Sequence, residues 1–218
     1  GRDTGRQQEL DALVGSLVLG AEGIDIEVRA TKEKSLVSGL AAVASEESVG
    51  LIVARTPRRG GLLGRLQAVR ALNTLGSAGV PVLFVSKIPA WEKTYVLSTR
   101  SLGGEAAARV AIDLAKGLGT ELTGVGVVPP TFVTGVDEIG EARAAAAWLR
   151  EEASVQGVGV HRKIRRGNPV RVIEELVGPE DLVVLPMPAM PVRLSRGAIA
   201  AYLLGRLPGP LLVVPPPV

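Results

Sequence analysis

Short apolar runs alternate with helical patterns along the second half of the chain. In residues 105–118, Ala107, Val110, Ala111 and Leu114 recur at the spacing that places them on one face of a helix. Gly119 follows this stretch, as glycine commonly follows the end of a helix. The pattern predicts strands at residues 95–99, 122–128, 158–164, 181–185 and 210–214, and helices at 105–118, 137–155, from 169 to near 177, and 194–206.

This alternation indicates an α/β fold. Strands that are apolar throughout, and that are separated by helices, are typical of a parallel sheet covered on both faces. Right-handed crossovers between the strands then follow from the twist of the sheet.

The first half repeats the last part of this order. Its runs GLIVA (50–54) and PVLFV (81–85) correspond to DLVVL (181–185) and PLLVV (210–214), at a similar separation. Further helices are predicted at 7–19, 35–44 and 63–75, and a further strand at 24–28. An internal repeat of this kind indicates two related units.

The repeat predicts a division of the chain into an incomplete first unit, residues 1–88, a linker, 89–93, and a complete second unit, 94–218. The first unit has no counterpart of strands 95–99 and 122–128, and so lacks its opening strands. Such a unit would expose long apolar edges. Either opening segments precede this sequence, a reading that its start without methionine favours, or another chain fills the gap.

Composition argues against several kinds of chemistry. The chain has no cysteine and one histidine, His161, which excludes thiolate metal sites and argues against a histidine metal centre. Ser195 has no evident base, and the carboxylates of 151–152 and 174–175 point apart on their helices. We therefore expect no catalytic site and no metal. The absence of cysteine also fits a reducing cytosol.

The charge is mildly basic, with a net charge of +3 and an isoelectric point near 9.5. Aromatic residues make up only 3%, too few for a stacking surface, so we expect no nucleic-acid binding. No apolar run approaches the length of about 18 residues that a membrane span needs. The basic run 161–166 could hold an anion or face acidic lipid, or it is the polar side of an exposed strand with Ile164 turned inward.

Residues 94–215 resemble the universal stress protein family. The resemblance rests on AAARVAIDLAKGLGTEL (106–122), on Gly167-Asn168-Pro169 before the third helix, and on the strands DLVVL and PLLVV in this order. It implies two parallel-sheet units of the kind found in universal stress proteins and in adenine nucleotide alpha hydrolases.

The resemblance also implies where a nucleotide would bind. Family members that bind ATP carry an Asp after the first strand, where this chain has Arg100, or Thr99 if the register shifts by one. They carry G-x2-G-x9-G-[S/T] after the fourth strand, because glycines let backbone N–H groups approach phosphate. Here only Gly197 fits the last glycine, and Ala198 stands where the hydroxyl would be. In the first unit, Gly61 and Gly64 form a G-x2-G that either keeps a phosphate site or belongs to a solvated basic loop. Binding of ATP, AMP or another nucleotide would accordingly be weak or absent.

Tandem domains of this family occur as cytoplasmic tails of membrane transporters, among them cation–proton antiporters, cation–chloride cotransporters and amino-acid permeases. The resemblance therefore implies a regulatory, dimerising module of an inner-membrane protein, whose partner is a second copy or the membrane part of the same protein. The alternative is a free-standing cytoplasmic stress protein that binds an adenine nucleotide or another small effector. Because pairing in this family often uses the fifth strand, a pseudo-twofold contact is predicted through Val82, Phe84, Leu211 and Val213.

Overall fold

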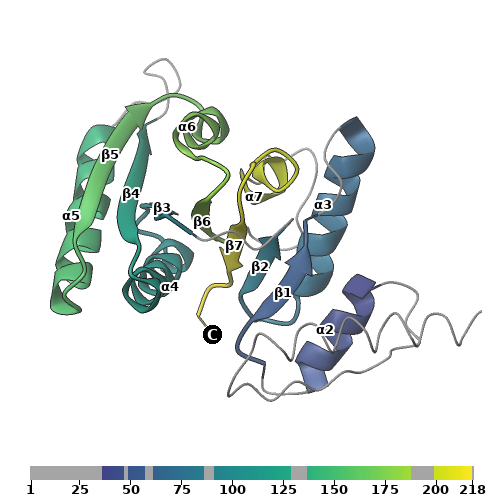
Figure 1. The fold of residues 1–218 in the computed structure, drawn as a ribbon. Helices are drawn as coiled ribbons and strands as arrows, with labels where there is room; N and C mark the ends of the chain where they lie inside the picture. The colour runs from purple at the N-terminus through teal and green to yellow at the C-terminus, as the bar shows by residue number, and fades with distance from the viewer. Residues whose placement is uncertain are drawn as a thin grey trace, which may run out of the picture. The chain divides into compact units, whose positions relative to one another are not determined.

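A seven-stranded, mostly parallel sheet organises the part of the chain that the structure describes (Figure 1). The computed structural model describes residues 36–46, 49–56, 61–85, 91–128, 137–187 and 199–217. These residues belong to one unit, Ser35–Val218. The predicted helix 7–19 and strand 24–28 lie outside the described residues.

The strands follow the order β1-β2-β7-β6-β3-β4-β5 across the sheet. Every pair of neighbours is parallel except β2 and β7, which are antiparallel. The α/β fold class is thereby confirmed. The strands are β1 (Ile52–Arg55), β2 (Val82–Val85), β3 (Lys93–Leu97), β4 (Glu121–Val128), β5 (Val160–Arg166), β6 (Asp181–Pro186) and β7 (Leu211–Val214).

Helices cover both faces of the sheet. One core holds buried side chains of α4 and α5 with one face of the strands, and the other holds those of α2, α3, α6 and α7 with the opposite face. The described helices are α2 (Leu36–Glu46), α3 (Gly61–Gly76), α4 (Leu102–Leu118), α5 (Glu138–Val155), α6 (Pro169–Leu176) and α7 (Ile199–Leu203).

Local signals set the ends of these helices. Ser101 and Asp137 accept hydrogen bonds from backbone N–H groups of the first turns of α4 and α5, and Asn168 does so for α6, where Pro169 takes the first position. Gly119 ends α4 in the left-handed conformation, at φ 66°, as predicted.

The β2–β7 ladder joins the two halves of the chain. Val82 pairs with Val213 and Phe84 with Leu211, so the four residues predicted for a contact lie in one ladder. All four side chains are buried in the same core. β2 and β7 are therefore interior neighbours in the sheet rather than edges. β2 and β3, which flank the predicted linker in the sequence, belong to this one sheet, and the linker's last residue, Lys93, begins β3.

The two outer strands differ from the interior in exposure. Leu51, directly before β1, and Val53 on β1 are 45% and 50% exposed. The residues aligned with them, Leu182 and Val184 on β6, are fully buried in the core that α4 completes. On β5, Ile164 is 37% exposed, so the prediction that it turns inward is only partly right. Its neighbour across the ladder is Gly126, which has no side chain to cover it.

Truncating Phe84 tests the importance of the β2–β7 ladder. We expect Phe84→Ala to lower the free energy of unfolding by about 3–5 kcal/mol, because a large buried side chain is replaced by a cavity. Urea denaturation followed by circular dichroism measures the change. Val53→Ala, on the exposed side of β1, is the matched control and should change stability by no more than about 0.5 kcal/mol. Equal effects of the two substitutions would contradict the buried ladder.

Candidate functional site

The order of the strands points to a crevice at the carboxyl ends of β3 and β6. From β3 the chain moves outward through β4 to β5, and it then returns to the other side of β3 with β6 and β7. In open α/β sheets, ligands bind where the order reverses in this way. The candidate site therefore consists of the segment that follows β3 and the segment that follows β6.

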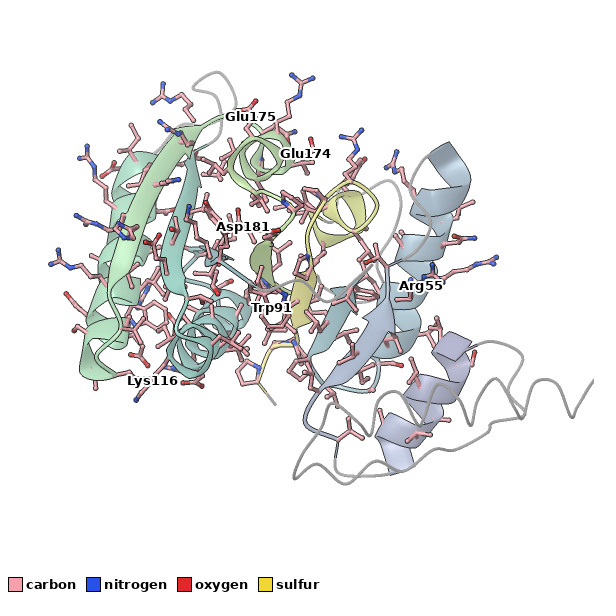
Figure 2. All side chains as sticks on the ribbon, viewed as in Figure 1. Arg55, Trp91, Lys116, Glu174, Glu175 and Asp181 are labelled. Atoms are coloured by element: carbon pink, nitrogen blue, oxygen red, sulfur yellow. The ribbon has the colours of Figure 1, made fainter. Side chains whose placement is uncertain are left out.

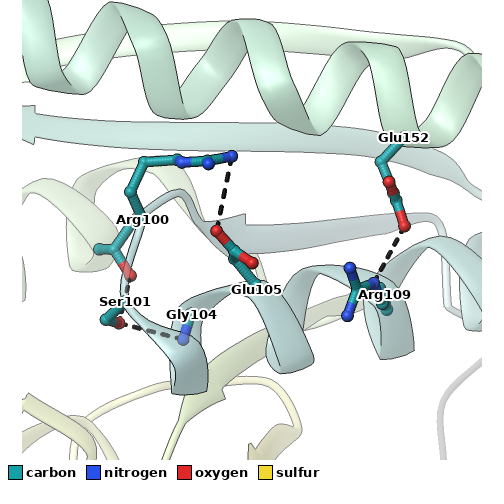
Figure 3. Close-up of polar contacts among 7 residues, drawn as sticks. Arg100, Ser101, Gly104, Glu105, Arg109 and Glu152 are labelled. Carbon is teal, nitrogen blue, oxygen red and sulfur yellow. Dashed lines mark hydrogen bonds and ion pairs between the residues drawn. The ribbon is translucent and has the colours of Figure 1, made fainter.

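The segment after β3 packs tightly onto the start of α4 (Figure 3). The Ser101 hydroxyl accepts a hydrogen bond from the Gly104 N–H at 3.1 Å, and it lies 3.1 Å from the Thr99 hydroxyl. A Cβ on Gly104 would collide with the Thr99 hydroxyl and lie 2.7 Å from the Thr99 carbonyl oxygen. Gly103 and Gly104 thus belong to the first turn of α4, whereas the sequence pattern placed them before the helix.

Arg100 lies between α4 and α5 and is held by two partners. Its guanidinium forms an ion pair with Glu105 at 3.5 Å (Figure 3). It also lies over the Trp148 ring, 5.2 Å from the ring centroid. Arg109 approaches the same ring and pairs with Glu152 at 2.9 Å. Of the two positions predicted to match the Asp of ATP-binding family members, Arg100 is therefore a cation with partners, and Thr99 lies against Gly104.

The segment after β6 offers little to a phosphate. Pro186 has no N–H, and the Met187 N–H donates to the Val214 carbonyl oxygen at 2.6 Å. The Met187 side chain is buried in the core. Gly197 and Ala198 lie outside the described residues. The last backbone position of β6 and the first position after it are therefore closed to an anion.

The glycines of the first half lie in a helix. Gly61 is the first residue of α3, and Gly64 is buried within its first turn. Arg58 and Arg59 lie outside the described residues. The glycine pair is thus part of a helical start and not, over the residues that the structure describes, an open loop.

Ser98 is a feature that sequence analysis missed. This last residue before the turn is buried, and its hydroxyl has no hydrogen-bond partner among the described residues. It faces Gly124 of β4, where an added Cβ would lie 2.9 Å from the hydroxyl oxygen. The only signal in the sequence was a polar residue at the end of an apolar strand.

Titratable groups in the described part of the chain form no reactive cluster. Burial raises the pKa of Tyr95, and the nearby carboxylates of Asp181 and Glu121 add to the effect, so the phenol stays neutral. Glu152 pairs with Arg109. Glu174 pairs with Arg206 at 3.3 Å and lies with Glu175 on α6 (Figure 2). No group of three or more His, Asp or Glu residues able to hold a metal occurs among the described residues.

A hollow of about 630 Å³ lies at the opposite, amino edge of the sheet, between the ends of α4 and α5 and the starts of β4 and β5. Lys116, Glu121 and His161 line it. It is open and lies away from the point where the strand order reverses.

Among the described helices, none is long and apolar enough to cross a membrane.

Comparison with known proteins finds a match to one protein family. A model of the universal stress protein family matches residues 95–215, nearly the range of the resemblance seen in the sequence. The match covers one domain, and the tandem repeat stays a prediction. No curated protein matches the chain.

Several solved structures share the fold. A functionally unknown protein from Pseudomonas aeruginosa PAO1 is 18% identical, with a TM-score of 0.65 over 96% of this chain and 78% of that one. A universal stress protein from Archaeoglobus fulgidus is 16% identical, with a TM-score of 0.65 over 96% and 77%. The cytoplasmic domain of a prokaryotic cation chloride cotransporter is 16% identical, with a TM-score of 0.52 over 83% and 69%. At these identities the likeness concerns the fold alone.

Two glycines of α4 test the tight packing of the site. Gly104→Ala should lower the free energy of unfolding by about 1–3 kcal/mol, because the new methyl group meets the Thr99 backbone. Gly117→Ala, where an added Cβ meets nothing within 4 Å, should raise it by about 0.5–1 kcal/mol. Thermal and urea denaturation measure both. If both substitutions changed the free energy of unfolding in the same direction, the close approach of Thr99 to α4 would be refuted.

Proposed function

Because the chain belongs to the universal stress protein family, whose model matches residues 95–215, we propose that it is a non-catalytic regulatory module and acts as the cytoplasmic domain of a membrane transporter. The observation that carries the proposal is the state of the crevice between β3 and β6. Arg100 is engaged by Glu105 and Trp148, Pro186 has no N–H, and the Met187 N–H is used by β7. A crevice with these features is a poor cradle for the phosphates of ATP.

The likeness to the cytoplasmic domain of a cation chloride cotransporter supports the transporter role. We propose further that β1, α3 and β2 are a shortened counterpart of β6, α7 and β7, so that the module is a tandem repeat. In this view, the two copies meet through their fifth strands, β2 and β7. An antiparallel ladder is what a pseudo-twofold relation between two copies would require.

The partner in this proposal is the membrane part of the same protein or a second copy of the module. The half-exposed side chains of Leu51, directly before β1, and Val53 on β1 support such a contact. Their counterparts on β6 are buried in the core that α4 completes, so this face of β1 presents apolar surface that a partner can cover.

A second candidate function is weak binding of an adenine nucleotide at a divergent site. The buried Ser98 hydroxyl favours it, since that group lies at the end of β3 without a partner among the described residues. A hydroxyl in this position can donate a hydrogen bond to a ligand in the crevice or accept one from it.

Nucleotide titration separates the two candidates. We expect ATP, AMP and cyclic dinucleotides at about 1 mM to leave the melting temperature unchanged. A ligand at a hundred times its Kd stabilises a protein by about 2.7 kcal/mol. For a domain of this size such a gain raises Tm by roughly 5–10 °C. Any reproducible rise that Ser98→Ala abolishes would favour the second candidate and count against the first, and a weak ligand would give a smaller rise than this.

The coding sequence upstream of Gly1 tests the transporter role. We expect several apolar segments of about 20 residues each, the length that spans a bilayer as a helix. Sequencing of the genomic reading frame gives the answer. A stop codon followed by a start codon directly before this chain would refute the role.

A further inference from the structure

A hollow of about 450 Å³ lies between α2, α3 and the sheet, away from the crevice between β3 and β6. The described residues that line it lie in four elements of the first half, α2, β1, α3 and β2. They are Val37, Ser38, Ala54, Arg55, Gln67, Arg70, Ala71, Thr74, Leu75 and Phe84. The proposed regulatory role does not use this hollow.

The lining combines buried apolar groups with exposed cations. Ala54, Ala71, Leu75 and Phe84 are all buried and form an apolar floor. Two exposed cations, Arg55 at the carboxyl end of β1 and Arg70 on α3, line the same hollow, and Figure 2 places Arg55 beside α3. Among the described residues that line the hollow there is no Asp or Glu, so these residues carry a net positive charge.

Neither arginine is neutralised within the part of the chain that the structure describes. The ion pairs among those residues involve Arg100, Arg109 and Arg206, and neither Arg55 nor Arg70 takes part in one. Arginine that is not paired presents several N–H donors in a planar fork that matches carboxylate and phosphate oxygens.

The hollow has a cause in the sequence. Ala54 occupies the position on β1 that Leu185 occupies on β6 when GLIVA is aligned with DLVVL. Leu185 is 1% exposed and belongs to the same core. Alanine is shorter than leucine by three carbon atoms, and this leaves space over β1 that a side chain fills over β6.

We propose that this hollow binds a small organic anion with an apolar body, such as a medium-chain carboxylate. The anionic head lies at Arg55 and Arg70, and the apolar body lies on Ala54, Ala71, Leu75 and Phe84. A volume of 450 Å³ falls within the usual size of small-molecule sites. It corresponds to the space of about fifteen water molecules, so the ligand has on the order of ten to fifteen non-hydrogen atoms. This site goes beyond the proposed function and does not depend on it.

The site gives the module an input for a small-molecule signal. Residues of both α2 and α3 line the hollow, so a ligand in it favours the state in which the two helices pack together. α3 also contacts α7, a helix of the second half. Binding in the first half is thereby linked to the packing of the second.

Calorimetric titration of the full chain with decanoate, decanol, octyl phosphate and inorganic phosphate tests the proposal. We expect decanoate to bind and decanol to bind at least about tenfold more weakly, because only the carboxylate uses the arginines. If octyl phosphate binds more tightly than decanoate, the site still takes an amphiphilic anion, and the preferred head is a phosphate monoester. If inorganic phosphate binds as tightly as decanoate, the apolar floor has no role and the proposal fails.

Substitutions locate the site. Arg55→Gln and Arg70→Gln should each weaken decanoate binding by about tenfold or more, as loss of a charge-assisted hydrogen bond does. Ala54→Leu should abolish binding, because it restores the side chain found at the matching position of β6. Arg171→Gln, an exposed arginine of α6, is the control and should leave binding unchanged. Circular dichroism checks that each variant folds. If Ala54→Leu does not fold, the two arginine variants still test the site. No decanoate binding at about 1 mM, or equal binding by all variants, would overturn the proposal.

Discussion

The antiparallel ladder between β2 and β7 is the interaction on which the rest of the structure depends. It is the only antiparallel junction in the described sheet, and it places Val82, Phe84, Leu211 and Val213 in one core. β1 and β2 have four residues each, and a pair of strands of that size is marginal in water by itself. Their stability therefore comes from the larger sheet to which the ladder attaches them.

Two places with different chemistry follow from this arrangement. The crevice at β3 and β6 belongs to the second half, where Arg100 has partners and the backbone after β6 is closed to phosphate. The hollow over β1 belongs to the first half, where Arg55 and Arg70 have no ion-pair partner among the described residues. In one half the polar groups near the ends of β3 and β6 are thus engaged within the protein, while the other half presents a positive, partly apolar pocket among its described residues.

The sequence predicted much of the fold because the signals involved are local. Helical spacing in α4, the left-handed Gly119 and the alternation of strands and helices depend on near neighbours, and the structure confirms them. The partners of Arg100 could not be predicted, since Trp148 comes from a different helix and the contact depends on packing. The hollow over Ala54 could not be predicted either, because it is recognised only when β1 is compared with β6 in one sheet. The burial of Ser98 was likewise not predictable, since it depends on β4.

Native-state amide hydrogen exchange tests most directly whether the two halves form one cooperative sheet. Exchange of the paired amides in Val82–Val85 and Leu211–Val214 reports the free energy of opening on each side of the ladder. The account predicts opening free energies for the two strands that agree within about 1 kcal/mol and that fall together in Phe84→Ala. Fast exchange in β2 beside slow exchange in β7 would contradict it, because β1 and β2 would then open without the rest of the sheet.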